Sequence, residues 1–93
     1  MTTRFVVDGA VQGVGFRHFV ALTANRLGLM GWVRNLDDGR VEVVARGPED
    51  RLHELERALR QGPRMARVAS VEKGSVSDEI ETPNPFMVSH LVD

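Results

Sequence analysis

The spacing of hydrophobic residues changes several times along the chain, and each change marks the boundary of a predicted element. Residues 5–10 form an apolar, partly β-branched stretch that predicts a strand. From Val14 onward the spacing becomes helical, and six residues define one face of the predicted helix: Phe16, Phe19, Val20, Thr23, Ala24 and Leu27. Gly28 follows at the place where a left-handed residue commonly ends a helix.

The middle of the chain predicts a hairpin. Residues 31–35 and 40–46 are predicted strands, and residues 36–39 between them contain the Asp-Gly pair typical of a tight turn. In the second strand apolar Val41, Val43 and Ala45 alternate with charged residues. This alternation indicates a strand that is buried on one face.

A second helix is predicted to begin at residues 47–50, where two acidic residues occupy the first turn. Leu52, Leu55 and Leu59 form its apolar stripe, and residues 61–63 (Gln-Gly-Pro) end it.

The last third has weaker signals. Residues 66–76 have β content, but their alternation slips between Val68 and Val71, which predicts a β-bulge. Residues 82–85 predict a loop, and the chain then continues into a short last strand that contains Phe86, Val88 and His90.

These elements follow one another in the order β-α-β-β-α-β, with a terminal β segment. That order favours an α+β, ferredoxin-like sandwich, in which an antiparallel sheet carries two helices on one face. The chain has 93 residues, so we expect residues 1–93 to form a single domain.

Composition excludes several classes of function. Hydrophobic residues make up 42% and charged residues 27%, as in an ordinary globular protein, and the net charge of −1 gives no general attraction to nucleic acid or to acidic membranes. The chain has no cysteine, which excludes disulfides, thiolate catalysis and cysteine-based metal sites. Residues 1–4 lack a signal-peptide pattern and no apolar run reaches 18 residues, so a cytoplasmic location without membrane contact is expected.

Candidate chemistry is concentrated in residues 8–17, Asp-Gly-Ala-Val-Gln-Gly-Val-Gly-Phe-Arg, which leave a predicted strand and enter a predicted helix. Glycines allow successive backbone N–H groups to point into one concavity, and a helix start adds unpaired N–H groups and a positive dipole end. Arg17 adds a cation suited to oxyanions. The segment therefore predicts a phosphate cradle, although a simple strand-to-helix turn is the alternative.

Two common phosphate motifs do not match this cradle. A Walker loop requires Gly-Lys-Ser/Thr at its end, where this chain has residues 15–18 (Gly-Phe-Arg-His). A dinucleotide fingerprint requires a third glycine where His18 stands.

Two signatures resemble the acylphosphatase family. Residues 9–17 contain its pattern Gly-x-Val-Gln-Gly-Val-x-Phe-Arg, and residues 31–42 contain Gly-Trp-Val-Arg-Asn, a short turn and Asp-Gly-x-Val-Glu. Residues 45–48 also resemble the usual approach to the second helix, whereas the ending at residues 86–93 departs from the family's apolar-x-apolar pattern.

The resemblance implies hydrolysis of a carboxyl–phosphate bond in small acyl phosphates such as acetyl phosphate, 1,3-bisphosphoglycerate or carbamoyl phosphate. It implies that Arg17 binds phosphate and Asn35 orients the attacking water. It also implies that the phosphate oxygens are held by the backbone amides of Gln12, Gly13, Val14, Gly15 and Phe16. We expect no metal, no cofactor and no nucleic acid partner, a monomer, and inorganic phosphate as product and inhibitor.

The residue types suit this reaction on chemical grounds. Phosphoryl transfer depends mostly on positioning and charge stabilisation, which backbone amides and a guanidinium provide. The carboxylate leaving group needs no strong general acid, and a neutral amide such as Asn35 can hold a water for in-line attack. The sequence leaves open which group accepts the water's proton, and Arg17 as a solvated residue or Asn35 as a turn residue are the structural alternatives.

The competing function is a non-catalytic, acylphosphatase-like anion-binding module related to carbamoyl-transfer maturation proteins. A length of 93 residues that begins with Met1 favours a free-standing enzyme. The dispersed His18, His53 and His90 are expected to be structural or surface residues, although His18 borders Arg17 and can tune its surroundings. Trp32 is expected to pack in the core or on the sheet.

Overall fold

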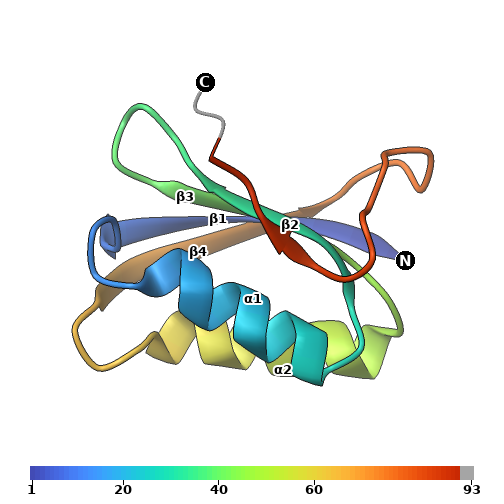
Figure 1. Ribbon diagram of the computed structural model, residues 1–93, viewed down its shortest axis with the longest axis horizontal. Helices are drawn as coiled ribbons and strands as arrows, with labels where there is room; N and C mark the ends of the chain where they lie inside the picture. The colour runs from blue at the N-terminus through green and yellow to red at the C-terminus, as the bar shows by residue number, and fades with distance from the viewer. Residues whose placement is uncertain (91–93) are drawn as a thin grey trace.

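A computed structural model describes residues 1–90, and its strands form one five-stranded sheet in the order β4-β1-β3-β2-β5. The strands are β1 (Thr2–Ala10), β2 (Met30–Asn35), β3 (Val41–Arg46), β4 (Arg67–Ser75) and β5 (Met87–Val88). Helices α1 (Phe16–Arg26) and α2 (Glu49–Gln61) both lie on one face of the sheet (Figure 1). This is the ferredoxin-like sandwich that the element order predicts.

Three of the four strand pairings are antiparallel, and the pairing of β2 with β5 is parallel. The difference from a fully antiparallel sheet arises because the chain leaves β4 at one edge and returns at the opposite edge beside β2. On the way, Pro83 accepts a hydrogen bond of 2.9 Å from the Gly31 amide, which ties the connection to the start of β2.

The predicted irregularity in β4 is confirmed. Asp8 faces Ser70 while Gly9 faces Val68, so Ala69 is the extra residue of a β-bulge. Gly9 has a φ of +136°, and a Cβ there would lie 2.1 Å from the carbonyl oxygen of Arg67. Glycine is therefore required where β1 passes the bulge.

The core lies between the sheet and the helices. Phe5, Val7, Val33 and Val43 point from the sheet toward the helices and are almost completely buried. The helices contribute the stripes that their periodicity predicts, namely Phe16, Val20 and Ala24 from α1 and Leu52, Leu55 and Leu59 from α2. Burying this apolar surface fixes both helices against the sheet, and with them the residues at their ends.

Strand β3 differs from its prediction, because the structure buries both of its faces. Glu42 on the face away from the helices is only 5% exposed, and Arg4 and Arg34 both form ion pairs with it. Burial pushes the pKa of the Glu42 carboxyl upward, but the hydrogen bonds from the two arginines outweigh it and leave the pKa below its usual value. Alternation in the sequence did not reveal this because a paired charge can be buried.

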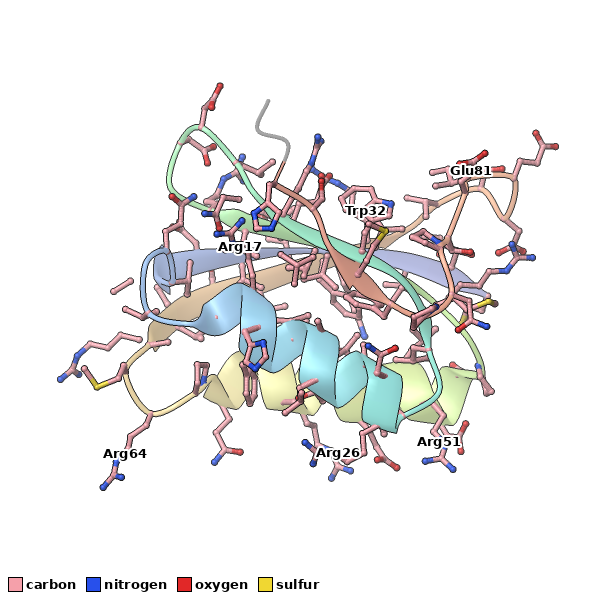
Figure 2. The ribbon with its side chains drawn as sticks, viewed as in Figure 1. Arg17, Arg26, Trp32, Arg51, Arg64 and Glu81 are labelled. Atoms are coloured by element: carbon pink, nitrogen blue, oxygen red, sulfur yellow. The ribbon has the colours of Figure 1, made fainter. Side chains whose placement is uncertain are left out.

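The surface carries charged side chains together with a few exposed apolar ones. Arg26, Arg51 and Arg64 extend from the helical side of the molecule, and Trp32 lies on the opposite face of the sheet (Figure 2). Trp32 is partly buried, with the Arg34 guanidinium 5.2 Å from its ring centre, which fits the sheet-packing role expected of it. Within residues 1–90, no helix is long and apolar enough to cross a membrane.

Candidate functional site

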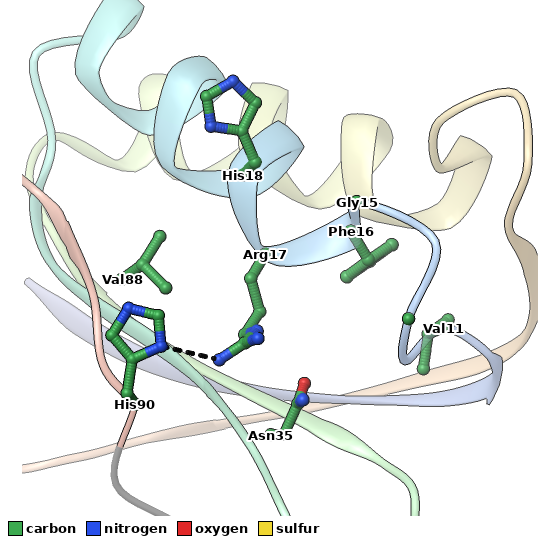
Figure 3. Close-up of a pocket in the computed structure, with 9 residues that line it drawn as sticks. Val11, Gly15, Phe16, Arg17, His18, Asn35, Val88 and His90 are labelled. Carbon is green, nitrogen blue, oxygen red and sulfur yellow. Dashed lines mark hydrogen bonds between the residues drawn. The ribbon is translucent and has the colours of Figure 1, made fainter.

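A pocket of about 350 Å³ opens where the loop after β1, the start of α1, the end of β2 and the residues after β5 meet (Figure 3). Its walls are formed by Val11, Gly13, Gly15, Phe16, Arg17, His18, Asn35, Val88 and His90. The sheet order explains the convergence, because β2 lies between β3 and β5 and so brings Asn35 close to the segment that follows β5.

The loop between β1 and α1 has the conformation that the glycine spacing predicts. Gly13 and Gly15 have φ values of +75° and +78°, and a Cβ on either would meet no atom of residues 1–90 within 4 Å. Glycine is therefore required at both positions because φ is positive, and not because a side chain would clash with its neighbours. Within residues 1–90, the backbone N–H groups of residues 12–16 donate no backbone hydrogen bond. They are available to an anion.

The start of α1 adds to this anion-binding potential. Gly15 is its N-cap in the left-handed conformation, and no side chain in the described part of the chain caps the helix. The first turn has no acidic residue, so the unpaired N–H groups and the positive dipole end are left for a ligand.

The side chain of Gln12 ties the loop to the β2–β3 hairpin. Its Nε2 donates hydrogen bonds of 2.8 Å to the Leu36 carbonyl and 2.9 Å to the Arg40 carbonyl. Leu36 and Arg40 flank the hairpin turn and are themselves paired through a 2.8 Å bond from the Leu36 amide. Gln12 therefore holds the loop in register with the strand end that carries Asn35.

Arg17 is the second residue of α1, and its guanidinium points across the pocket toward Asn35 and the C-terminal segment (Figure 3). Nη1 lies 3.4 Å from the Ser89 carbonyl oxygen and 3.5 Å from His90 Nδ1. Both contacts are at the long limit for hydrogen bonds, and in the described part of the chain no carboxylate forms an ion pair with Arg17. Its positive charge is therefore available to an incoming anion.

Asn35 ends β2, opposite Val41 of β3, with its side chain directed into the pocket (Figure 3). Its Oδ1 is buried and has no hydrogen-bond partner among residues 1–90. A buried acceptor without a partner is costly and uncommon in a folded protein, so we expect a water or a ligand to donate a hydrogen bond to this oxygen.

The structure brings together most of the residues singled out in the sequence. Gly13, Gly15, Phe16, Arg17 and Asn35 line one pocket, whereas Gln12 and Val14 are absent from its wall. Their backbone amides remain predicted phosphate ligands, and the Gln12 side chain has the additional role of holding the loop.

His90 was expected to be structural or on the surface, and its side chain is exposed; that it also lines the pocket was not predicted from the sequence. The predicted last strand, which included Phe86 and His90, is longer than the observed one, because β5 comprises only Met87–Val88 and His90 lies beyond its end. Its place beside Arg17 could not be inferred, because that depends on β5 pairing with β2.

A sequence model of the acylphosphatase family, described as "Acylphosphatase", matches residues 3–88. An "Acylphosphatase" of Koribacter versatilis (strain Ellin345) is 55% identical over 78 residues, covering 84% of this chain and 71% of that relative. A solved structure described as an acylphosphatase from Coxiella burnetii superposes with a TM-score of 0.87 and 39% identity, over 95% of this chain and 90% of that one. HypF from T. kodakarensis contains a similar segment, with a TM-score of 0.83 and 30% identity over 100% of this chain but 12% of HypF.

Proposed function

The chain belongs to the acylphosphatase family, and we infer that it hydrolyses the carboxyl–phosphate bond of small acyl phosphates to a carboxylate and inorganic phosphate. One observation carries this inference. Three features face the same pocket: a loop with unpaired amides, the charge of Arg17, and the unpartnered Oδ1 of Asn35.

We propose that the phosphate group lies in the loop, held by the amides of residues 12–16 and by the Arg17 guanidinium. The amides and the guanidinium are fixed before substrate arrives, so they stabilise charge on the equatorial oxygens without reorganising. The open conformation of Gly13 and Gly15 supports this placement, because it leaves the backbone accessible.

We assign Asn35 to the attacking water. Its unpartnered Oδ1 accepts a hydrogen bond from that water and orients the water oxygen toward phosphorus. The water oxygen forms the new P–O bond as the P–O bond to the acyl group breaks, and the electron pair leaves on the carboxylate. The protons of the water end on oxygens of the product phosphate, which exchanges them with solvent. Since a carboxylate is a stable leaving group at neutral pH, the reaction needs no general acid at that oxygen.

The non-catalytic, HypF-like module is the weaker alternative. The similarity to HypF covers only 12% of that protein, whereas the relative from Koribacter versatilis matches over 71% of its own length. The pocket also contains the unpartnered Asn35 acceptor, which a site that only binds anions does not require.

We further propose that residues 1–93 act as a single domain and a monomer in the cytoplasm, without metal or cofactor, and that inorganic phosphate inhibits by occupying the loop. Within residues 1–90, no group of three or more His, Asp or Glu is placed to bind a metal ion. The site chemistry above assigns every role to backbone amides, Arg17 and Asn35.

Hydrolysis of benzoyl phosphate, followed by its ultraviolet absorbance in the presence of chelator, tests the proposal. Arg17→Ala is expected to weaken phosphate inhibition by about 10–100-fold and to lower turnover, because a charge-assisted hydrogen bond is lost. Asn35→Ala is expected to lower kcat by about 100-fold while phosphate inhibition stays close to that of the wild type. Arg26→Ala is the matched control, because Arg26 is an exposed arginine at the other end of the same helix.

Two outcomes contradict the proposal. Unchanged phosphate inhibition in Arg17→Ala removes the assigned phosphate site. A folded wild-type protein that binds phosphate but does not turn over benzoyl phosphate moves the function to anion binding.

A further inference from the structure

His90 lies beside Arg17 at the rim of the phosphate site, although the two residues are far apart in the sequence. His90 Nδ1 is 3.5 Å from Arg17 Nη1, and both side chains line the same pocket (Figure 3). His90 is exposed, so its ring exchanges protons with solvent directly. An imidazole here has no role in the hydrolysis described above.

The fold sets the position of His90 through three attachments of the preceding residues. Val88 pairs with Val33 of β2, and the Ser89 amide donates a 2.8 Å hydrogen bond to the Val33 carbonyl. Asn25 of α1 holds Phe86 on both sides, donating to its carbonyl at 3.0 Å and accepting from its amide at 2.9 Å. The segment is thus fixed along the helix that carries Arg17.

Among the described residues, the pocket wall around His90 carries a positive charge from Arg17 and no carboxylate. Among the described residues that line the pocket, the charged or titratable ones are Arg17, His18 and His90. Arg34 and Glu81 share a separate pocket with Ser89. A phosphate anion in this pocket lies beside two side chains, Arg17 and His90, whose nitrogens can both donate a hydrogen bond to it.

We propose that His90 is a second cationic ligand of the phosphate site, which supplements Arg17 when substrate or inorganic phosphate is bound. The inference rests on the proposed placement of phosphate in the loop. In the empty site the Nδ1 lone pair of neutral His90 accepts a hydrogen bond from Arg17. When phosphate arrives, Arg17 donates to the phosphate instead. His90 then takes a proton from solvent and donates an N–H to a phosphate oxygen.

Because imidazole changes charge between about pH 5 and pH 8, this second ligand strengthens phosphate binding as the pH falls. A unit charge added within several ångströms of the anion, at the rim of a solvated pocket, is expected to raise affinity about three- to tenfold. The same group is expected to lower KM for an acyl phosphate at acidic pH without an equal change in kcat.

The test compares the wild type with His90→Asn, in which the amide oxygen replaces the Nδ1 acceptor but the side chain cannot ionise. Affinity for inorganic phosphate is measured by calorimetric titration at about pH 5.5 and about pH 8, the range over which imidazole changes charge. Phosphate itself changes charge over this range, and its contribution cancels when the wild-type affinity is divided by the variant affinity at the same pH. We expect this ratio to be near one at the higher pH and about three to ten at the lower pH.

Two further histidine variants make the result specific. His53→Asn is the matched control, because His53 is an exposed histidine on α2 that lines no part of this pocket. It is expected to behave as the wild type at both pH values. His18→Asn shows whether the other imidazole at the rim carries the effect, and an acid-strengthened affinity lost only in that variant overturns the assignment to His90.

Equal pH dependence in the wild type and in both His90→Asn and His90→Gln also overturns the inference. Its failure is distinguishable from failure of the proposed function through Arg17→Ala. If Arg17→Ala loses phosphate binding while the His90 variants do not differ from the wild type, only the role of His90 is wrong. If Arg17→Ala binds phosphate normally, the phosphate site itself is misplaced.

Discussion

Replacing Asn35 with alanine is expected to make the protein more stable and a much poorer catalyst. The buried Oδ1 of Asn35 has no partner among residues 1–90, so it depends on a water held in the pocket, and immobilising that water costs up to about 2 kcal/mol. Alanine removes this cost but loses some packing of a partly buried side chain, which leaves a net gain of about 1 kcal/mol. In a domain of this size that gain corresponds to a rise in Tm of about 4–8 °C.

The same change removes the proposed acceptor for the attacking water, so kcat is expected to fall about 100-fold. Opposite changes in stability and activity are typical of a residue that is kept for function at a cost to the fold. Thermal unfolding followed by circular dichroism measures Tm, and hydrolysis of benzoyl phosphate by the same protein preparation measures kcat.

Asn25→Ala is the matched control with the opposite expected sign. Its amide makes hydrogen bonds of 3.0 Å and 2.9 Å with the backbone of Phe86, so truncation leaves two backbone groups unpaired. After allowing for the better helix propensity of alanine, we expect a loss of about 0.5–2 kcal/mol. A fall in Tm for Asn35→Ala as large as that for Asn25→Ala would refute the reasoning, because it would make Asn35 a structural residue.

Three further changes test other parts of the site and the sheet. Gly15→Ala is expected to cost about 1–2 kcal/mol and to weaken phosphate inhibition, because φ is +78° there, whereas Gly74→Ala, also in open space, should leave inhibition unchanged. Gln12→Ala removes both bonds from the loop to the hairpin, and we expect a phosphate affinity several-fold lower by titration with a stability loss of about 1–3 kcal/mol. The pKa of Glu42 lies below its usual value in the folded state, so its stabilisation is present above about pH 4.3 and is lost as the pH falls through the lower folded value. In Glu42→Gln, the free energy of unfolding should lack this loss at acidic pH. If its dependence on acidic pH equals that of the wild type, the two arginine contacts do not stabilise the fold.

The elements nearest the phosphate loop could be predicted because their signals are local. Gly13 and Gly15 adopt positive φ values that the spacing of glycines anticipates, and the apolar stripes of both helices follow from a period that depends on neighbouring residues alone. The bulge at Ala69 was predictable for the same reason, since an extra residue shifts the alternation within one strand.

The sequence by itself thus determined the order of elements, the loop and the two side chains, Arg17 and Asn35, on which the proposed hydrolysis depends. Only the tertiary structure decided that β5 pairs in parallel with β2, that Gln12 bonds across to Leu36 and Arg40, and that His90 lies beside Arg17. Each of these depends on strand pairing between distant parts of the chain. Such pairing is selected by the packing of the whole core, which no local pattern of residues encodes.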